Sequence, residues 1–386
     1  MLDLGPVHRT EYELDPSEHV VIAEAPGRLH YLGEHGEPKA GLYLSSAINR
    51  TIRVAVSLRK DNSLRFFAVD LGERKRTTLA NLKYKREDRW ANYIKLAVHL
   101  FAQRGFPVKG LNFTVSGDIP QQAGLASSTA IEVASAVALR GFLKASVPDR
   151  ELLPGLIRAE AEFLGRDVSP VDYLIAFNGK KDHFLLVDEA SREVIKIKSP
   201  FGKYKMLLMD SRVPRAGVEE ELDRRKKDTR KGLELLARGK QGTSFRNYEP
   251  GDLLESMGDL SEEIRRRSLH VVEENQRVRE AAEALKKGEL ADLSRVIYHS
   301  HESLRDLYEV SCPEIDWLVK RAQEIEGVVA SRMTGMGFGG CTYTILKDSA
   351  REEYRKRLED YERIFGFHPL VYEFRPAPGV RLTAKG

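Results

Sequence analysis

The chain has 386 residues, 41% of them hydrophobic, which is enough to bury a large core and fits two domains. The 62 Lys and Arg residues nearly balance the 58 Asp and Glu residues, and the net charge of +4 is not gathered into a basic tract. Charge therefore does not favour nucleic-acid binding.

Two cysteines, Cys312 and Cys341, are too few for a secreted disulfide framework, although they could pair with each other. No stretch reaches the roughly 18 consecutive apolar residues that a transmembrane helix needs. The N-terminus lacks the apolar region of a signal peptide. We therefore expect a cytoplasmic protein with no removed segment and with neither a membrane nor a nucleic acid as a partner.

The first half of the chain alternates between strand-like and helix-like segments. β-Branched and aromatic residues predict strands over 20–29, 51–58, 63–71, 111–119, 183–188, 193–199 and 203–213. Between the fourth and fifth of these, apolar residues recur at helical spacing from Ser127 to Leu143. This part of the chain is thus predicted to be an α/β domain.

The second half has a different character. Segments 218–239 and 275–288 each carry one apolar stripe and one charged face, which predicts surface helices joined by a polar loop. Further on we predict strands over 327–333, 341–347 and 369–376, and a helix over 351–365. The change falls between residues 190 and 205, so we expect domains spanning 1–195 and 196–386.

A small-residue turn, PQQAGLASST at residues 120–129, precedes the predicted helix. Such a turn presents unpaired backbone N–H groups and the positive end of the helix dipole, and Ser127 and Ser128 add hydroxyls. A triphosphate suits this surface, although the turn lacks the Gly-Lys-Ser/Thr ending of a P-loop. The alternative is an ordinary helix N-cap.

Two further glycine-containing runs stand out. Residues 27–41 gather Arg28, Glu34, His35 and Glu37, which could surround a hydroxylated ligand or could simply form a polar loop. The run TGMGFGGC, 334–341, has four glycines in six positions between two predicted strands. That density implies a close backbone approach to a ligand or to another segment of the chain.

Two carboxylates lie between these motifs. Glu160 falls on a predicted helix and could give an oxygen ligand to Mg²⁺, or could be solvated. Asp172 lies in an apolar segment, where an unpaired charge would be unfavourable. A partner such as Arg28 would keep it ionised and able to accept a proton from a hydroxyl. The alternative for Asp172 is an N-cap or a structural ion pair.

The three motifs resemble those of the GHMP kinase superfamily, and specifically of the galactokinase family, in order and spacing. They are APGRLHYLGEH (25–35), IPQQAGLASSTAIEVASA (119–136) and SRMTGMGFGGCTYTIL (331–346). The similarity extends from about Val20 to about Pro378. It implies a GHMP kinase fold of two domains, an N-terminal α/β domain and a C-terminal ferredoxin-like α+β domain, with the active site in the cleft between them.

The resemblance also implies site residues and a reaction, the transfer of a phosphoryl group from ATP, with Mg²⁺, to the anomeric hydroxyl of galactose or a related sugar. It implies Asp172 and Arg28 as catalytic residues, and Glu160 with Ser128 or its neighbour Ser127 as the metal ligands. On the nucleotide side it implies Trp90 at the adenine, the turn Gly124, Leu125, Ala126, Ser127 and Ser128 at the phosphates, and the third-motif glycines Gly335, Gly337, Gly339 and Gly340. We expect a monomer or a weak homodimer.

For the sugar, the resemblance points to Glu34, His35, Glu37 and Ser169, but this is where the chain departs from the family pattern. The family signature continues Gly-Glu-His-Thr-Asp-Tyr, whereas residues 33–38 read Gly-Glu-His-Gly-Glu-Pro. Ser169 stands where a glycine normally approaches the sugar, and Tyr173 follows the aspartate in place of the family's glutamine. These changes predict a reshaped sugar pocket.

Two alternatives follow from those departures. Lys39, Arg212 and Arg215 could meet a carboxylate, so the substrate could be a uronic acid such as galacturonate. The protein could also be a non-catalytic sensor that binds sugar and ATP and acts through a protein partner. Loss of the catalytic acid or of a metal ligand would favour the sensor, but Asp172 and Glu160 are both present.

Overall fold

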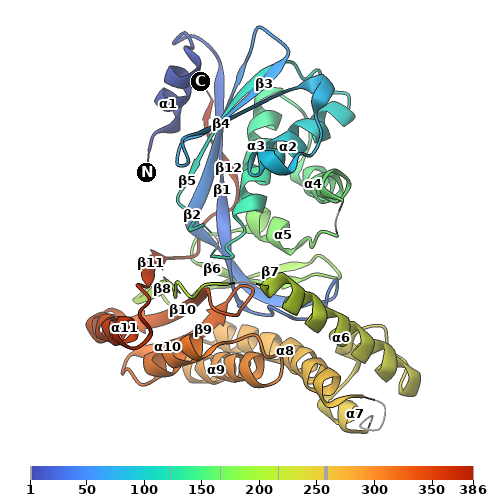
Figure 1. Cartoon of the computed structure of the whole chain (residues 1–386), viewed down its shortest axis with the longest axis vertical. Coiled ribbons are helices and arrows are strands. Elements are labelled where there is room, and N and C mark those ends of the chain that lie inside the picture. Colours follow the sequence, from blue (N-terminus) through green and yellow to red (C-terminus); the bar gives the residue numbers. More distant parts are fainter. Residues whose placement is uncertain (1, 122, 166, 216, 256–259, 386) are drawn as a thin grey trace.

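The computed structural model describes residues 2–121, 123–165, 167–215, 217–255 and 260–385. Its upper part in Figure 1 is a twisted sheet with helices on both faces. The strands are β1 (Val20–Leu32), β2 (Leu42–Leu58), β3 (Ser63–Ala68), β4 (Glu73–Thr78), β5 (Leu111–Gly117), β6 (His183–Asp188), β7 (Val194–Lys198) and β12 (Arg381–Lys385). Their order is β12-β1-β2-β5-β3-β4, and β6 pairs with β2 and β7.

Helices α2 (Ala91–Gln103), α3 (Ser127–Phe142), α4 (Asp149–Leu164) and α5 (Val171–Asn178) lie together on one face of this sheet (Figure 1). Helix α3 packs directly on β1 and β2 through small residues of its buried side. Ala130, Ala134 and Val137 let the helix lie close to the strands. The helix predicted at 127–143 is confirmed, and its N-terminus is thereby fixed beside β1.

The lower part is built on a second sheet with the order β11-β8-β10-β9, all neighbours being antiparallel. These strands are β8 (Tyr204–Asp210), β9 (Val328–Thr334), β10 (Cys341–Lys347) and β11 (Leu370–Phe374). The helices are α6 (Val218–Gly239), α7 (Pro250–Glu255), α8 (Glu262–Lys287), α9 (Leu290–Asp306), α10 (Pro313–Gln323) and α11 (Arg351–Phe365). Strand order and connections are those of a ferredoxin-like fold, so the predicted two-part α+β architecture is confirmed.

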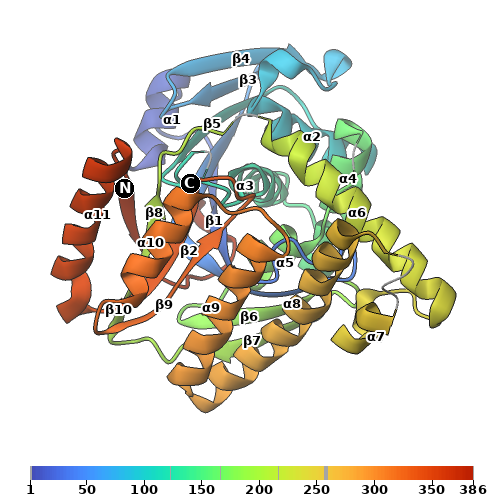
Figure 2. The same cartoon turned by 60° about the horizontal axis from the view of Figure 1, so that its bottom comes forward.

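The two parts share one hydrophobic core. Tyr31 of β1 lies 4.6 Å from Phe184 of β6 and 5.2 Å from Tyr343 of β10, measured between ring centroids. The Tyr343 hydroxyl also donates to the backbone oxygen of Tyr31 at 2.9 Å. The strands that carry the first and third motifs are therefore packed against each other, and Figure 2 shows α8 and α9 running side by side beneath them.

The chain crosses between the two parts more than once. The expected domain boundary at residues 195 and 196 falls within β7, so residues up to 198 still belong to the first sheet. Strand β12 returns from the second part and pairs with β1. The division into 1–195 and 196–386 remains a proposal. Cys312 and Cys341 are both free thiols.

Helix α1 (Leu4–Tyr12) was not predicted and packs on β2 and β5, on the face opposite α3. Its His8 is fully buried, with ring nitrogens 2.7 Å from Thr114 Oγ1 and 2.9 Å from Ser57 Oγ. Burial, assisted by the neighbouring Arg9, lowers the pKa of His8 to about 3. The folded protein therefore keeps this ring neutral at a pH where the unfolded chain protonates it.

This difference makes stability depend on pH. The contribution of His8 is complete above its unfolded pKa of about 6.5 and is lost as the pH falls below that value, because only the unfolded state then takes up the proton. Between pH 6.5 and 4.5 we expect this group to lower the free energy of unfolding by about 2 kcal/mol. Urea unfolding at both pH values should show a smaller loss for His8→Gln than for the parent. An equal loss in both proteins would contradict the assignment.

Candidate active site

An arginine–aspartate pair lies where the first sheet meets α5. Arg28 Nε donates to Asp172 Oδ1 at 2.7 Å, and Arg28 Nη2 donates to Asp172 Oδ2 at 3.3 Å. Burial alone would lower the pKa of Arg28, but the charge of Asp172 raises it, so Arg28 is the charged partner in this pair. The Asp172 side chain is still 28% exposed. A carboxylate held this way is oriented and remains accessible to a ligand.

His30 is the second basic group beside this aspartate. Its Nε2 lies 3.7 Å from Asp172 Oδ1, and its Nδ1 lies 2.6 Å from Ser45 Oγ. Burial, together with the charges of Arg28 and Arg332, holds the pKa of His30 well below its usual value. His30 is thus neutral at physiological pH, and Arg28 is the cation that pairs with Asp172.

The small-residue turn lies against β1 next to this pair. The register of β1 against β2 shifts at Gly27, where a Cβ would lie only 3.0 Å from the backbone oxygen of Leu125. Arg28 binds the turn twice: its backbone N donates to Leu125 O at 3.1 Å, and its Nη1 donates to Gly124 O. Arg28 therefore connects the turn to Asp172.

The turn opens into a pocket of about 560 Å³. Gly124 and Ala126 both have positive φ angles, 73° and 59°. Ala126 is the N-cap of α3 and has no side-chain oxygen to cap it, so the first turn of the helix keeps N–H groups for a ligand. The lining comprises Pro120, Gly124, Leu125, Ala126, Ser127, Ser128, Arg215, Gly217, Val218, Glu219, Glu220 and Met336.

The third-motif glycines form a tight turn between β9 and β10 at the edge of this pocket. Gly335, Gly337, Gly339 and Gly340 all have φ between 83° and 106°. A Cβ on Gly337 would lie 2.3 Å from the backbone oxygen of Val310. The glycines are thus required for close backbone packing, and Met336 is the member of the turn that reaches the pocket lining.

Glu34 and His35 both bind this turn. Glu34 accepts from the backbone N of Gly335, from Thr334 Oγ1 at 3.3 Å and from Arg332 Nη1 at 3.1 Å. His35 Nε2 lies 3.1 Å from the backbone oxygen of Gly335. Burial lowers the pKa of His35 to about 4, so the neutral ring donates this hydrogen bond. Both residues expected at the sugar thus hold the first motif against the third.

Behind Glu34 lies a chain of buried charges that the sequence did not reveal. Arg332 is fully buried; its Nη2 lies 3.4 Å from Glu274 Oε1 and its Nε donates to Ser300 Oγ at 3.0 Å. Glu274 also accepts from the backbone N of Gly33 at 2.9 Å and from Arg277 Nε at 2.8 Å. Burial alone would raise the pKa of Glu274, but the charges of Arg277 and Arg332 outweigh burial and lower this pKa to about 2. Glu274 is therefore an ionised link between α8 and the first motif.

Glu37 is directed toward the loop between α6 and α7. Its Oε2 accepts from Ser244 Oγ at 2.6 Å and from the backbone N of Phe245 at 2.8 Å. Arg246 of the same loop donates to Asp188 at 2.8 Å and 3.0 Å. The longer side chain at position 37 thus anchors that loop, and its role as a sugar ligand stays a prediction.

Ser169 binds a carboxylate that the sequence analysis did not single out. Its Oγ donates to Glu189 Oε1 at 2.7 Å, and Tyr43 OH lies 3.5 Å from Glu189 Oε2. Tyr43 also packs on His30, with 5.1 Å between ring centroids, so this group adjoins the catalytic pair. Burial raises the pKa of both Glu189 and Glu37. The candidate sugar site is thus rich in acidic and hydroxyl groups.

The three cations considered for a uronic acid do not converge on this site. Lys39 is 78% exposed and pairs with Asp167 at 3.2 Å. Arg212 pairs with Asp210 at 3.6 Å. Arg215 lines the pocket of the small-residue turn. Their expected common role is therefore wrong: the chain places them in three different environments.

Glu160 lies on α4 beside a second buried glutamate. The Tyr173 hydroxyl donates to Glu160 Oε2 at 2.8 Å and also contacts Glu132 Oε2 on α3. Burial first, and then the charges of Glu132 and Glu160, hold the pKa of Tyr173 well above its usual value. In the described residues no group of three or more His, Cys, Asp or Glu side chains is arranged to hold a metal.

Trp90 is buried at the start of α2, and its Nε1 donates to Glu73 Oε2 at 3.0 Å. It is absent from the lining of the pocket at the small-residue turn. Its contact with adenine therefore stays a prediction.

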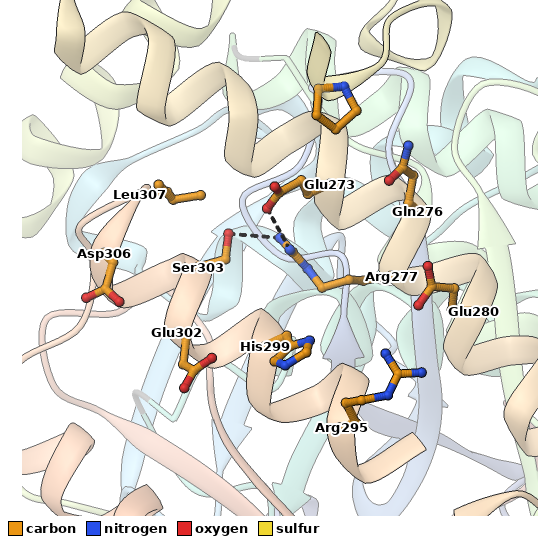
Figure 3. Close-up of a pocket in the computed structure, with 11 residues that line it drawn as sticks. Glu273, Gln276, Arg277, Glu280, Arg295, His299, Glu302, Ser303, Asp306 and Leu307 are labelled. Atoms are coloured by element: carbon orange, nitrogen blue, oxygen red, sulfur yellow. Dashed lines mark hydrogen bonds and ion pairs between the residues drawn. The ribbon is translucent and has the colours of Figure 1, made fainter. Parts of the chain in front are cut away.

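A separate pocket of about 490 Å³ lies between α8 and α9 (Figure 3). Its rim mixes acidic and basic side chains, including Glu280, Glu302 and Arg295. At its inner end Arg277 binds Glu273 at 2.9 Å and Ser303 Oγ at 2.9 Å, as the dashed lines in Figure 3 show. Acidic side chains outnumber the arginines in this lining, and the pocket is distinct from that at the small-residue turn.

Comparisons of the sequence and of the fold with known proteins point to one class of protein. The sequence model of the GHMP kinases N terminal domain matches residues 92–180, and that of the GHMP kinases C terminal matches residues 281–362. The galactokinase galactose-binding signature matches residues 7–58. The mevalonate kinase of Methanococcus jannaschii shares the fold, with a TM-score of 0.69 at 20% identity over 94% of this chain and 100% of that chain. The fold and site therefore define an ATP-dependent kinase of the GHMP class.

Closer relatives narrow the class. A protein from Treponema pallidum is 40% identical over 380 residues, 97% of this chain and 95% of that protein. The galactokinase of Thermotoga maritima is 34% identical over 359 residues, 93% of this chain and 99% of that protein. The structure of Lactococcus lactis galactokinase complexed with galactose has a TM-score of 0.88 and 26% identity, covering 98% of this chain and 99% of that one. This chain belongs to the galactokinase family, and it is a sugar kinase.

None of the helices in the described residues combines the length and apolar character needed to cross a membrane.

Proposed function

We propose that the protein transfers the γ-phosphoryl group of ATP to the anomeric hydroxyl of galactose. One observation carries the proposal: Arg28 binds Asp172 on one side and the carbonyl of Gly124 on the other. A single arginine thus joins the candidate catalytic carboxylate to the turn suited to phosphates. Membership of the galactokinase family supports galactose as the acceptor.

In this proposal Asp172 accepts a hydrogen bond, and then the proton, from the attacking hydroxyl. Phosphoryl transfer requires mainly positioning and charge stabilisation, so the oriented, partly exposed carboxylate is sufficient as the base. Arg28 orients Asp172 and offsets negative charge near the transferring group. The N–H groups at the start of α3 would bind the phosphate oxygens.

The residues also fit Mg²⁺, which is held by one or two carboxylates together with phosphate oxygens and water. Ser128 lines the phosphate pocket, and Glu160 is a buried carboxylate close to a second one, Glu132. A serine hydroxyl and a carboxylate are both oxygen donors of the kind that Mg²⁺ prefers. We propose Ser128 and Glu160 as ligands; when bound, the ion would neutralise phosphate charge.

Galactose is favoured over galacturonate on electrostatic grounds. Glu37, Glu189 and Asp172 are all carboxyl groups near the proposed sugar site, while Lys39 points to the exposed Asp167. A carboxylate substrate would meet these acidic groups, while Lys39 and Arg212 are each paired with an aspartate. We propose Glu34, His35, Glu37 and Ser169, with Glu189 and Tyr43 behind them, as the walls of the sugar site.

The test is ADP release from Mg-ATP with galactose, N-acetylgalactosamine, arabinose, galacturonate, glucose and mevalonate. We expect kcat/KM for galactose to exceed that for galacturonate by at least about 100-fold, since an unpaired charge is disfavoured by several kcal/mol. Phosphorus NMR of the product identifies the phosphorylated position. Turnover of galacturonate alone, or a product phosphorylated away from C1, would overturn the proposal.

A further inference from the structure

Tyr173 stands at the junction of the three helices that carry the proposed catalytic and metal-binding groups. It follows Asp172 on α5, and its hydroxyl reaches Glu160 on α4 at 2.8 Å and Glu132 on α3. Each of these helices contributes one member of the cluster Glu132–Tyr173–Glu160. The cluster is therefore a polar link between segments that are far apart in the sequence.

The cluster is buried, which makes its geometry strict. Glu132 is 0% exposed, Tyr173 1% and Glu160 5%. A buried carboxylate that loses a hydrogen-bond donor keeps the desolvation penalty of that oxygen, so the hydroxyl between Glu132 and Glu160 helps to fix the positions of both. Displacement of one member should be transmitted to the others.

The cluster lies directly behind the phosphate pocket. Glu132 follows Ser128 by four residues on α3, so both residues lie on the same face of the helix one turn apart. Ser128 lines the pocket, whereas Glu132 is buried. The hydroxyl of Tyr173 thus ties Glu160 to the helix that presents Ser128.

We propose that Tyr173 is a positioning residue that sets the place of Glu160 relative to Ser128 and Asp172. This inference rests on the proposed function, in which Ser128 and Glu160 hold Mg²⁺. Groups that orient a metal ligand typically change metal affinity by 10- to 100-fold when they are removed. The ring of Tyr173 supports the core, and its hydroxyl supports the metal site.

The test separates these two roles with Tyr173→Phe, which removes only the hydroxyl. Mn²⁺ replaces Mg²⁺ as the probe, and its dissociation constant is measured by electron paramagnetic resonance in the presence of the ATP analogue AMPPNP. We expect Mn²⁺ to bind at least about tenfold more weakly to the variant. In turnover assays, the Mg²⁺ concentration for half-maximal rate should rise by a similar factor, with KM for galactose within twofold of the parent.

The matched control is Tyr354→Phe. Tyr354 lies on α11 in the second part of the fold and is also buried, at 4% exposure. Its hydroxyl accepts a hydrogen bond from Thr344 Oγ1 at 3.3 Å. The Tyr354→Phe variant also lacks one buried hydroxyl, but we expect it to bind Mn²⁺ with the affinity of the parent. An effect of the same size in both variants would show a general loss of stability and would overturn the proposal.

The proposal would also be overturned if the Tyr173→Phe variant unfolds cooperatively on heating, as a folded protein does, and binds Mn²⁺ as tightly as the parent. Should that variant fail to fold, Glu132→Gln takes its place, because it leaves the Tyr173 ring in the core and changes only the second carboxylate that the hydroxyl contacts. Glu132→Gln should weaken Mn²⁺ binding at least threefold, and parental affinity would refute the inference. A parent that binds Mn²⁺ more tightly than its variants but phosphorylates no sugar would preserve this inference and refute only the proposed reaction.

Discussion

Asp172→Asn should lower kcat for galactose by about 1,000-fold or more, because a positioned base typically contributes 10²- to 10⁴-fold and this one also holds Arg28. Asparagine has nearly the same shape, so it can occupy the same place, but it can neither accept the proton nor form an ion pair with the guanidinium that reaches Gly124. ADP release under saturating galactose and Mg-ATP measures the loss, and KM for ATP should change by less than threefold.

A matched control is available in the loop between β2 and β3. Arg59 and Asp61 form a similar two-point pair, with Nε to Oδ1 at 2.8 Å and Nη2 to Oδ2 at 2.7 Å. Asp61→Asn should leave kcat unchanged, because this pair stands apart from the pocket lining and from Asp172. Equal rates for Asp172→Asn and the parent would remove Asp172 from its catalytic role.

Arg332→Met should lower the free energy of unfolding by about 3–5 kcal/mol, the usual effect of removing one partner of a buried ion pair. Arg332 is fully buried and contacts both Glu34 and Glu274, so its loss leaves two buried carboxylates with one cation fewer. Urea unfolding at pH 7 measures the change.

Arg355→Met gives the comparison. Arg355 is exposed on α11 and binds Glu352 and Glu359 of the same helix, so its removal should leave unfolding nearly unchanged. Adding Glu274→Gln to Arg332→Met should recover part of the lost stability, because Glu274 keeps only one of its two arginine partners, Arg277, in the single variant. The free energy of unfolding of the double variant is compared with the value expected when the effects of the two single changes are added. A double variant that is less stable than this expected value would contradict the assigned network.

Sequence reasoning predicted the regular elements well because they are encoded locally. The alternation of LNFTVSG and the helical spacing after Ser127 correspond to β5 and α3. It did not predict helices α1, α2 and α10 or strands β4 and β12, and in α1 and β12 the apolar residues form no clear period. Their structure depends on packing against strands that come from other parts of the chain.

The candidate site was predictable as a set of motifs, but its connections were not. The family resemblance implied Arg28 and Asp172 as partners, and the structure confirms their contact. Glu132, Glu274 and Arg332 were missed. Glu132 and Arg332 are charged residues within an apolar helix or strand segment, which is a sign of a buried partner, whereas Glu274 lies in a polar helix. Their partners lie up to hundreds of residues away, so no local pattern could identify them.

The pairing of β12 with β1 has a consequence for biosynthesis. Residues 381–385 are translated after every strand of the second sheet, yet they cover the edge of β1, the strand that bears Arg28. The nascent first part would therefore leave the ribosome with an uncovered strand edge, and it would depend on its own late-arriving segment to close it. Removal of that segment should yield chains that aggregate during expression, even though none of its residues lines a pocket at the site.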